Sequence, residues 1–382
     1  MIKKLYIFIA LTGLLNTFAQ TTITDSIISG GIYRSYILYV PAIYTGTNAR
    51  PLIINMHGYT SNAQQQQLYS NFMPIADTAN FLMVYPNGTY SSGQRFWNAG
   101  LSATLVDDIG FISHLIDSLK AQYNIDMNAV YSTGMSNGGF MSHTLACELS
   151  NRITAIASVT GSIFTTQYGS YCHPGRPVPV MQIHGTADPT VPYAGNTSQG
   201  MVPVDSVVKY WVTKNGCNPT PVFTNVPNTN TSDGCTAEHY VYNGGNLGST
   251  CELYKIIGGA HTWPGSPFTI GVTNQDFSAS VEIWRFFRKY RLNTLTSVST
   301  IDKENTNFKL YPNPANDLLN FSFNGNDYKA INIDITDVLG NTIIHEANSS
   351  GKINIAALTT GIYFLSLTSE GKEVVKAKFI KE

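Results

Sequence analysis

A serine between two glycines is the first group in this sequence that could carry out covalent chemistry. Ser136 lies in Gly134-Met135-Ser136-Asn137-Gly138, after the apolar run 129–133 and before a helical pattern. A buried strand is therefore predicted to turn sharply into a helix at Ser136, and small residues beside the serine permit that turn and expose its hydroxyl. A Gly-x-Ser-x-Gly pattern is also found in ordinary glycine-rich turns, so a nucleophile at Ser136 requires partners elsewhere in the chain.

A serine nucleophile needs a histidine to take its proton and a carboxylate to orient that histidine. Asp188 and His261 each come just after the end of a predicted buried strand, and both follow Ser136 in the chain. A lone histidine in a loop is more often a surface residue, but the order serine, aspartate, histidine is that of α/β-hydrolases. We predict a catalytic triad of Ser136, Asp188 and His261, with acyl transfer as its chemistry.

Acyl transfer also needs N–H groups that stabilise the negatively charged oxygen of the intermediate. The backbone N–H of Asn137, directly after the serine, is one predicted donor. The second is predicted in the loop after the strand that ends at His57, where the N–H of Tyr59 or of Thr60 could serve. His57 itself is interpreted as a residue that shapes this loop.

Two further pairs of residues admit both a functional and a structural interpretation. Trp97 and Trp263 lie in loops near the motifs and are predicted to bind substrate, although loop packing explains them equally well. Asp107 and Asp108 precede an apolar helical pattern. Their carboxylates suit the positive end of a helix dipole, so we interpret them as structural.

Composition narrows the possible classes of protein. The chain has 382 residues, of which 43% are hydrophobic, so more than one domain is expected. The 23 Lys and Arg residues nearly balance the 24 Asp and Glu residues, and no basic stripe is present, which excludes a nucleic-acid role. The sequence contains neither a CxxC pair nor an HExxH motif, so we expect no zinc site or other metal.

The first 19 residues are interpreted as a signal peptide. Lys3 and Lys4 precede the apolar run 5–15, and small residues near position 19 suit cleavage. That run is shorter than the roughly 20 residues needed to cross a bilayer, and no later segment is long and apolar enough. We therefore expect a secreted protein without a transmembrane segment.

Export permits disulfides, and the chain has five cysteines. Cys147 follows the predicted serine helix and Cys172 lies in the loop after the next strand, so these two are the preferred pair. Two of Cys217, Cys235 and Cys251 could form another bridge, and an odd cysteine then remains.

Alternating strands and helices predict an α/β fold with a mostly parallel central sheet covered on both faces. Strands are predicted at 33–40, 51–56, 81–85, 129–133, 153–159, 178–183 and 252–257. Helices are predicted at 62–79, from 107 onward, after Ser136, at 203–214 and at 278–290, the last with Val281, Trp284 and Phe287 on one face.

Six motifs in this order resemble those of the secreted polyhydroxybutyrate depolymerase and feruloyl esterase group, which is similar to carbohydrate esterase family 1. They are His57-Gly58, 96–100, 106–108, Gly134 to Gly139, 184–188 and 258–264. The resemblance covers about residues 24–291 and implies an α/β-hydrolase domain at 20–292. It also implies ester hydrolysis by Ser136, Asp188 and His261 without a cofactor. Tyr59 departs from the pattern, because many members have Cys there, and this removes any disulfide at that position.

The resemblance implies a secreted serine esterase but leaves the ester open. We expect a feruloyl or acetyl xylan esterase that acts on plant polysaccharide esters. The alternative within the group is a polyhydroxyalkanoate depolymerase. A serine peptidase on the same fold is disfavoured because such enzymes usually carry extra gating domains. An alternative of another class is a catalytically idle, hydrolase-like protein that binds at the cell surface.

The tail has a different character from the rest of the chain. A polar linker is predicted at 293–305, followed by a small β-sandwich domain at 306–382 with short strands at 318–323, 331–335, 342–345, 362–367 and 374–380. Residues 310–315 and 361–363 resemble the type A sorting domain of the type IX secretion system of Bacteroidota. That resemblance implies export by this machinery and removal of the domain. A carbohydrate-binding sandwich would need an exposed aromatic platform, and the tail has no Trp.

Overall fold

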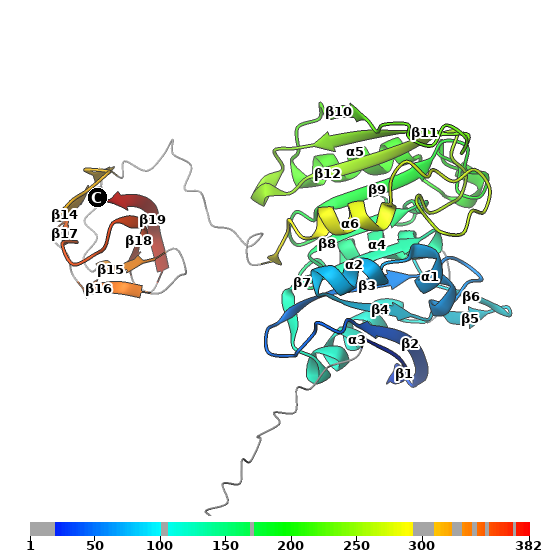
Figure 1. Ribbon diagram of the computed structural model, residues 1–382, viewed down its shortest axis with the longest axis horizontal. Coiled ribbons are helices and arrows are strands. Elements are labelled where there is room, and N and C mark those ends of the chain that lie inside the picture. The colour runs from blue at the N-terminus through cyan, green and yellow to red at the C-terminus, as the bar shows by residue number, and fades with distance from the viewer. Residues whose placement is uncertain are drawn as a thin grey trace, which may run out of the picture. The chain divides into compact units, whose positions relative to one another are not determined.

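The computed structural model describes residues 20–100, 106–168, 172–292, 309–322, 331–337, 342–347, 351–369 and 372–382. They fall into two compact units, one within residues 1–297 and the other within 298–382 (Figure 1). The predicted signal peptide and linker lie outside the described residues. Within the described ranges, no helix combines the length and apolar character that a bilayer crossing requires.

A ten-stranded sheet runs through the described part of the larger unit (Figure 1). In chain order its strands are β1 (Thr21–Ser29), β2 (Ile32–Val40), β3 (Arg50–Met56), β4 (Leu82–Pro86), β7 (Ile125–Met135), β8 (Ala155–Val159), β9 (Val180–Gly185), β10 (Val222–Asn225), β11 (Thr236–Tyr242) and β12 (Cys251–Ile257). Their order across the sheet is β1-β2-β4-β3-β7-β8-β9-β12-β11-β10. The six central strands, β4, β3, β7, β8, β9 and β12, are parallel. The strands β1, β2, β10 and β11 pair antiparallel at the two edges. A short hairpin, β5 (Thr89–Ser91) and β6 (Gln94–Phe96), stands apart from this sheet.

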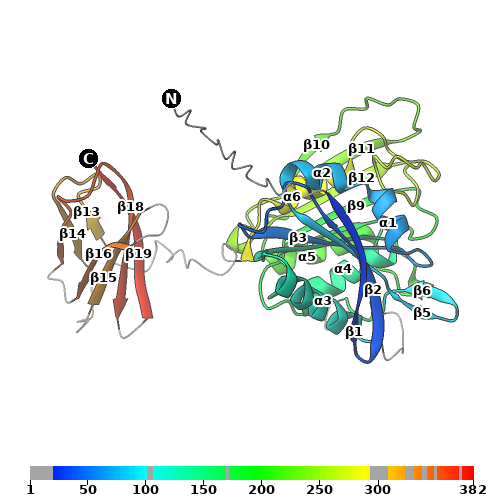
Figure 2. The same ribbon diagram turned by 60° about the horizontal axis from the view of Figure 1, so that its bottom comes forward.

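Helices cover both faces of the sheet, as Figure 2 shows. They are α1 (Ala63–Ser70), α2 (Met73–Ala79), α3 (Asp108–Gln122), α4 (Asn137–Glu148), α5 (Val204–Asn215) and α6 (Ala279–Phe287), with 3-10 turns at Thr197–Gln199 and Asn246–Gly248. Helices α3, α4 and α5 pack in the core that holds Leu52 and Ile54 of β3, whereas α1, α2 and α6 pack in the core that holds Ile53. Successive residues of a strand face opposite sides, so each face receives its own apolar core.

The predicted helix at 62–79 is two helices. Asn71 caps α1 in the left-handed conformation, with φ of 49°, and its N–H donates to the Gln67 carbonyl. α2 then begins with Pro74 in its first turn, where a residue without an N–H is tolerated best. The prediction was wrong because an apolar pattern continues across the break, while the asparagine and proline reset the backbone.

The predicted apolar face of the last helix was also wrong in part. α6 buries Ala279, Ile283, Phe286 and Phe287, which recur at helical spacing, whereas Val281 is 48% exposed. Of the predicted set, Phe287 is buried and Trp284 packs against Phe81, so only Val281 lies off the face that meets the sheet.

The edge strands gave no usable sequence signal. β1, β10 and β11 were not predicted, and the side chains of β10 are all exposed. An edge strand whose two faces are both exposed to solvent has no alternation of apolar and polar side chains. Such a strand can be recognised only by its backbone pairing with a neighbour.

The preferred disulfide is present. Cys147 at the end of α4 is bonded to Cys172, and their Cα atoms are 4.9 Å apart. A second bridge, which the sequence allowed, is not formed: Cys217, Cys235 and Cys251 are free and buried.

Asp107 and Asp108 have different structural roles. Asp107 caps α3, because its carboxylate accepts a hydrogen bond from the Gly110 N–H at 2.7 Å. Asp108 is buried and pairs with the guanidinium of Arg34, and its other oxygen accepts the Asn98 N–H at 2.7 Å. The structural interpretation of both residues is therefore confirmed, although only Asp107 acts as a cap.

The smaller unit consists of two antiparallel sheets in its described part. One contains β13 (Lys309–Tyr311), β14 (Leu318–Ser322) and β17 (Lys352–Asn354). The other contains β15 (Ile331–Thr336), β16 (Thr342–Ala347), β18 (Gly361–Ser369) and β19 (Lys372–Lys381). Leu319 and Phe321 of the first sheet share a core with Ile333 and Leu365 of the second, which is the packing of a small sandwich.

A buried ion cluster fastens α6 to the sheet. Glu252 of β12 is 1% exposed and accepts hydrogen bonds from His239, Arg285 and Lys289, at 2.9, 2.7 and 3.0 Å. Burial by itself would raise the pKa of this carboxyl, but the His239 hydrogen bond and the two cations outweigh burial and lower the pKa to about 2.

This cluster predicts an acid-dependent loss of stability. Because the folded state lowers the pKa of Glu252 from 4.5 to about 2, its carboxylate contributes stability above pH 4.5 that disappears as the pH falls toward 2. Glu252→Gln should destabilise the protein by about 3 kcal/mol at pH 7 and by much less near pH 2, measured by urea unfolding. Glu148→Gln, at an exposed position of α4, is the control. A deficit of Glu252→Gln that stays constant from pH 7 to pH 2 contradicts this account.

Candidate active site

The turn at Ser136 ends β7 and begins α4. Ser136 has φ of 55° and ψ of −120°, a conformation that residues with a side chain avoid. Its N–H donates to the Val159 carbonyl at 2.8 Å, and its own carbonyl accepts the Phe140 N–H at 3.0 Å. The hydrogen bonds on both sides hold a strained residue in place, a state found most often at functional sites.

Two glycines make this turn possible. A Cβ on Gly138 would lie 2.2 Å from the Met56 carbonyl oxygen and 2.8 Å from that of His57. A Cβ on Gly134 would lie 2.7 Å from the same Met56 oxygen. The obstructing atoms belong to the backbone at the end of β3, so they cannot swing aside, and a side chain at either glycine would separate β3 from the serine turn.

Asp188 and His261 meet at the same end of the sheet. His261 Nδ1 lies 2.6 Å from Asp188 Oδ2, and because a carboxylate only accepts, Nδ1 carries the proton and Nε2 is the basic nitrogen. The other Asp188 oxygen accepts the N–H groups of Thr190 and Val191 at 2.8 and 2.9 Å. Burial alone would raise the pKa of Asp188, yet the donors around it hold that pKa below its ordinary value, so the carboxyl is ionised.

A buried series of hydrogen bonds leads to His184, which lies beside Asp188. Trp211 Nε1 donates to His143 Nδ1 at 3.1 Å, so His143 Nε2 donates to the side-chain Oε1 of Gln182 at 3.1 Å. The Gln182 amide donates to His184 Nδ1 at 3.2 Å, and His184 Nε2 then donates to the Val191 carbonyl at 2.8 Å. His184 Nε2 also lies 3.4 Å from Asp188 Oδ2.

Sequence reasoning did not find this chain. The available signal was two polar residues, Gln182 and His184, at alternate positions of an otherwise apolar buried strand. Polar groups are rarely buried without partners, so such a pair indicates a buried network.

The structure separates the two candidates for the second oxyanion donor. The N–H of Thr60 donates to the Arg95 carbonyl at 2.8 Å, so it is not available to a substrate, and Thr60 is removed as a candidate. Among the described residues, the N–H groups of Tyr59 and Asn137 donate to no backbone carbonyl. Tyr59 lines the same cavity as Ser136, and Asn137 is the first residue of α4.

His57 fixes the loop that carries Tyr59. The Gly88 N–H donates to His57 Nε2 at 3.0 Å, which leaves Nδ1 to donate to the Gly58 carbonyl at 2.7 Å. Burial lowers the pKa of His57 to about 4, so the ring is neutral near pH 7. Both ring nitrogens are occupied, and His57 shapes the loop and does not move protons, in agreement with the sequence interpretation.

Trp97 does not bind substrate, contrary to prediction. It is fully buried, its Nε1 donates to the His57 carbonyl at 3.0 Å, and its ring stacks on Phe111. The Asn137 side chain accepts the Trp97 N–H at 2.6 Å and donates to the Trp97 carbonyl at 3.0 Å. Trp97 is thus a packing residue that holds the His57 loop against the serine turn.

Trp263 is also a packing residue, so its predicted contact with substrate was wrong. Its side chain is 1% exposed, and its Nε1 donates to Ser280 Oγ at 3.0 Å. Its backbone N–H donates to Tyr69 Oη at 3.1 Å, and its ring packs edge-on against Phe72. The tryptophan anchors the loop of His261 to α1 and α6.

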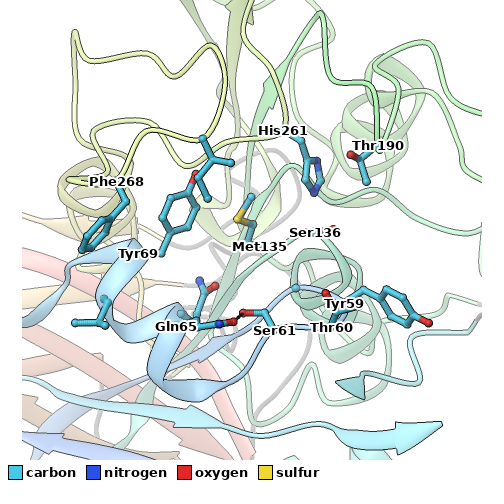
Figure 3. Close-up of a pocket in the computed structure, with 14 residues that line it drawn as sticks. Tyr59, Thr60, Ser61, Gln65, Tyr69, Met135, Ser136, Thr190, His261 and Phe268 are labelled. Atoms are coloured by element: carbon cyan, nitrogen blue, oxygen red, sulfur yellow. Dashed lines mark hydrogen bonds between the residues drawn. The ribbon is translucent and has the colours of Figure 1, made fainter. Parts of the chain in front are cut away.

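Ser136 and His261 face one cavity of about 660 Å³, which we call the serine cavity (Figure 3). Its apolar walls include Leu68 and Tyr69 of α1 and Met135 of β7, and Figure 3 shows Phe268 at the side away from Tyr59. Its remaining lining residues are Gly58, Tyr59, Thr60, Ser61, Gln65, Gln66, Thr190 and Ile270. The apolar walls at Leu68, Tyr69, Met135 and Phe268 were not predicted, because these residues come from separate parts of the chain, among them the glutamine-rich helix α1.

Two family models match this chain. Residues 34–193 match a model described as Esterase PHB depolymerase, and residues 309–382 match one described as Secretion system C-terminal sorting domain. The resemblance inferred from the motifs is confirmed. The matched esterase segment contains Ser136 and Asp188, and the matched sorting segment covers the described part of the smaller unit from β13 onward.

Curated relatives of this chain include two fungal esterases. Feruloyl esterase B of Piromyces equi is 28% identical over 236 residues, which span 60% of this chain and 42% of the relative. The bifunctional acetylxylan esterase/xylanase XynS20E of Neocallimastix patriciarum is 31% identical over 173 residues, 45% of this chain and 24% of the relative. The chain therefore spans less than half the length of these two relatives.

A solved structure shares the fold. The acetyl xylan esterase from Aspergillus awamori superposes with a TM-score of 0.50 at 15% identity, over 71% of this chain and 99% of that chain. The predicted α/β-hydrolase fold is thereby confirmed for the esterase segment.

The close approach at Gly138 predicts a severe effect of a single methyl group. Gly138→Ala should destabilise the protein by at least about 2 kcal/mol, because the new Cβ meets the backbone of Met56 and His57. Gly175→Ala is a matched control, since its Cβ would lie 3.6 Å from the nearest atom, Ser150 Oγ, and its cost should be within about 0.5 kcal/mol. Chemical unfolding of both variants measures the difference, and equal stabilities contradict the close approach.

Proposed function

We propose that this protein is a secreted serine esterase that cleaves aromatic acyl esters of the feruloyl type from plant polysaccharides. The observation that carries the proposal is the apolar serine cavity beside Ser136 and His261. An acetyl group would leave most of a 660 Å³ cavity unfilled, whereas an aromatic acyl group can contact Tyr69, Met135 and Phe268. The names of the two fungal relatives support esters of plant polysaccharides as the substrate class.

The proposed reaction follows from the arrangement of the triad. Ser136 Oγ attacks the ester carbonyl carbon while His261 Nε2 takes its proton, and Asp188 stabilises the resulting imidazolium through Nδ1. The carbonyl oxygen becomes an oxyanion that accepts the N–H groups of Tyr59 and Asn137. The tetrahedral intermediate then collapses, His261 gives the proton to the departing alcohol, and the acyl group remains on Ser136. A water molecule repeats the same steps and releases the acid.

A second candidate substrate is a polyhydroxyalkanoate. The family description that matches residues 34–193 names a polyhydroxybutyrate depolymerase activity, and an apolar cavity also accepts short hydroxyacid esters. Assays of methyl ferulate, acetylated xylan and hydroxybutyrate oligomers, run side by side, separate the candidates. We expect the highest kcat/KM for methyl ferulate, and a preference for hydroxybutyrate oligomers would replace the first candidate with the second.

We infer that the smaller unit directs export through type IX secretion machinery and that the esterase unit acts outside the cell or on its surface. The sorting-domain match to residues 309–382 supports this destination, and the disulfide between Cys147 and Cys172 suits an oxidising compartment. The proposed signal peptide at 1–19 would supply the preceding step across the inner membrane.

Loss of the nucleophile tests the proposal most directly. Ser136→Ala should reduce hydrolysis of a soluble aryl ester to background while far-UV circular dichroism and melting temperature stay close to those of the wild type. A fluorophosphonate probe should label the wild type at Ser136 and leave Ser136→Ala unlabelled. Undiminished turnover in the variant would overturn the assignment, and a wild type that resists the probe would favour the idle binding protein.

The role of the acid predicts a large effect without loss of structure. In Asp188→Asn the amide can donate to His261 Nδ1, which places the proton on Nε2 and removes the base, so kcat should fall about ten-thousandfold. Asp117→Asn, which only breaks a surface ion pair with Arg152, is the control and should keep wild-type kcat. A fall of less than about tenfold for Asp188→Asn contradicts the assigned role.

A further inference from the structure

A second cavity, of about 500 Å³, adjoins the serine cavity. The two cavities share Thr60 and Ser61, which Figure 3 shows at the edge of the serine cavity with Tyr59. Thr60 and Ser61 form a wall common to both cavities. Arg95, which lines the second cavity, holds this wall in place, because its carbonyl accepts the Thr60 N–H. A molecule bound in one cavity can therefore extend into the other beside this loop. We call the second one the polar cavity.

The lining of the polar cavity differs in chemistry from that of the serine cavity. It consists mainly of neutral hydrogen-bonding groups: the amides of Asn62, Gln64, Gln67 and Gln94, and hydroxyls such as that of Ser61. Neutral donors and acceptors in this density match the hydroxyl groups of a sugar better than the methylene chain of a polyester. A site for a carboxylate ligand would instead be expected to contain a cationic side chain that is free to pair with it.

The single cation in this lining already has partners. Arg95 Nη1 donates to the Gly88 carbonyl and Arg95 Nη2 to Tyr90 Oη, each at 2.9 Å. The guanidinium also lies 4.4 Å from the centre of the Tyr90 ring. These contacts orient the Tyr90 ring, which is 65% exposed at the cavity. A fixed, exposed aromatic face beside amides is suited to contact the apolar face of a sugar ring.

One buried group in the cavity still lacks a partner. Gln67 is 7% exposed, and its Nε2 makes no hydrogen bond to any residue that the structure describes. A buried amide donor without a partner costs free energy unless a ligand or water accepts its hydrogen bond. Gln67 lines the polar cavity, so a hydroxyl bound there can satisfy this donor.

We propose that the polar cavity binds the saccharide of a polysaccharide ester while the acyl group occupies the serine cavity. This inference rests on the proposed function and deepens it, because it assigns the sugar to a site of its own. It commits the enzyme to esters on a carbohydrate chain, since a polyester would have to place apolar methylene groups against the amides around Gln67.

A ratio of two substrates tests the proposal. The value of kcat/KM is measured for a feruloylated arabinoxylan oligosaccharide and for methyl ferulate, which lacks the sugar. The ratio of the two values should fall about tenfold in Tyr90→Ala and in Gln67→Leu, since each variant removes a proposed contact to the sugar and leaves Ser136, Asp188 and His261 in place. Gln122→Ala, at an exposed position of α3, is the matched control and should keep the wild-type ratio. A wild-type ratio in both Tyr90→Ala and Gln67→Leu overturns the proposal.

Direct binding separates this inference from the proposed function. Calorimetry with Ser136→Ala and an unesterified arabinoxylan oligosaccharide should show binding that weakens about tenfold when Tyr90→Ala is added. Absence of binding to Ser136→Ala overturns the saccharide site whatever the catalytic results. If the oligosaccharide binds but the wild type does not hydrolyse methyl ferulate, the proposed acyl specificity fails and the saccharide site stands. The melting temperature of each variant identifies any that has lost its fold.

Discussion

The contact between Gly138 and the end of β3 is the constraint on which the rest of the site depends. No side chain fits there, because a Cβ would lie 2.2 Å from the Met56 carbonyl oxygen. That proximity forces Ser136 into a left-handed conformation at the start of α4 and brings the His57 loop beside it. Ser136 and the Tyr59 N–H therefore follow strands that are neighbours in the sheet but distant in the chain. Packing of Trp97 and its two backbone hydrogen bonds with the Asn137 side chain preserve this spacing.

Burial of the acid shows how the fold stabilises a charge at the site. A carboxylate taken out of water is costly unless donors surround it. Asp188 receives two backbone N–H groups and His261, while His184 lies close by and is held by Gln182. In the series of hydrogen bonds that runs from Trp211 through His143 and Gln182 to His184, each partner fixes the tautomer or rotamer of the next. The loop at 188–191 therefore has one well-defined arrangement. That rigidity fixes the direction of the His261 ring, and geometry of this kind is what a triad requires.

The loop 57–62 connects catalysis to specificity. Its first part carries Tyr59, the proposed oxyanion donor, into the cavity that Ser136 lines, and its second part, Thr60 and Ser61, lines both the apolar cavity and the polar one. His57 anchors one end of the loop through Gly88, and the Arg95 carbonyl holds Thr60. Arg95 and Gly88 are also tied to each other, since the guanidinium donates to the Gly88 carbonyl. A single small hairpin, β5 and β6, thus supports both the proposed oxyanion donor and the proposed sugar-binding ring of Tyr90.

The sequence by itself determined the α/β class and the order of the central strands along the chain. It indicated Ser136, Asp188 and His261 as the candidate triad, because each follows a local pattern at a strand end. It also indicated the disulfide of Cys147 and Cys172 and the two-part organisation of the chain. Only the tertiary structure decided that Trp97 and Trp263 pack loops and that the Thr60 N–H donates to the Arg95 carbonyl. It also decided that Gln182 and His143 belong to the hydrogen-bond network behind Asp188. The same holds for the edge strands β1 and β10 and for both cavities. Local patterns record the direction and burial of the backbone near one residue, whereas cavities, edge pairing and the partner of a hydrogen bond depend on residues that meet only after folding.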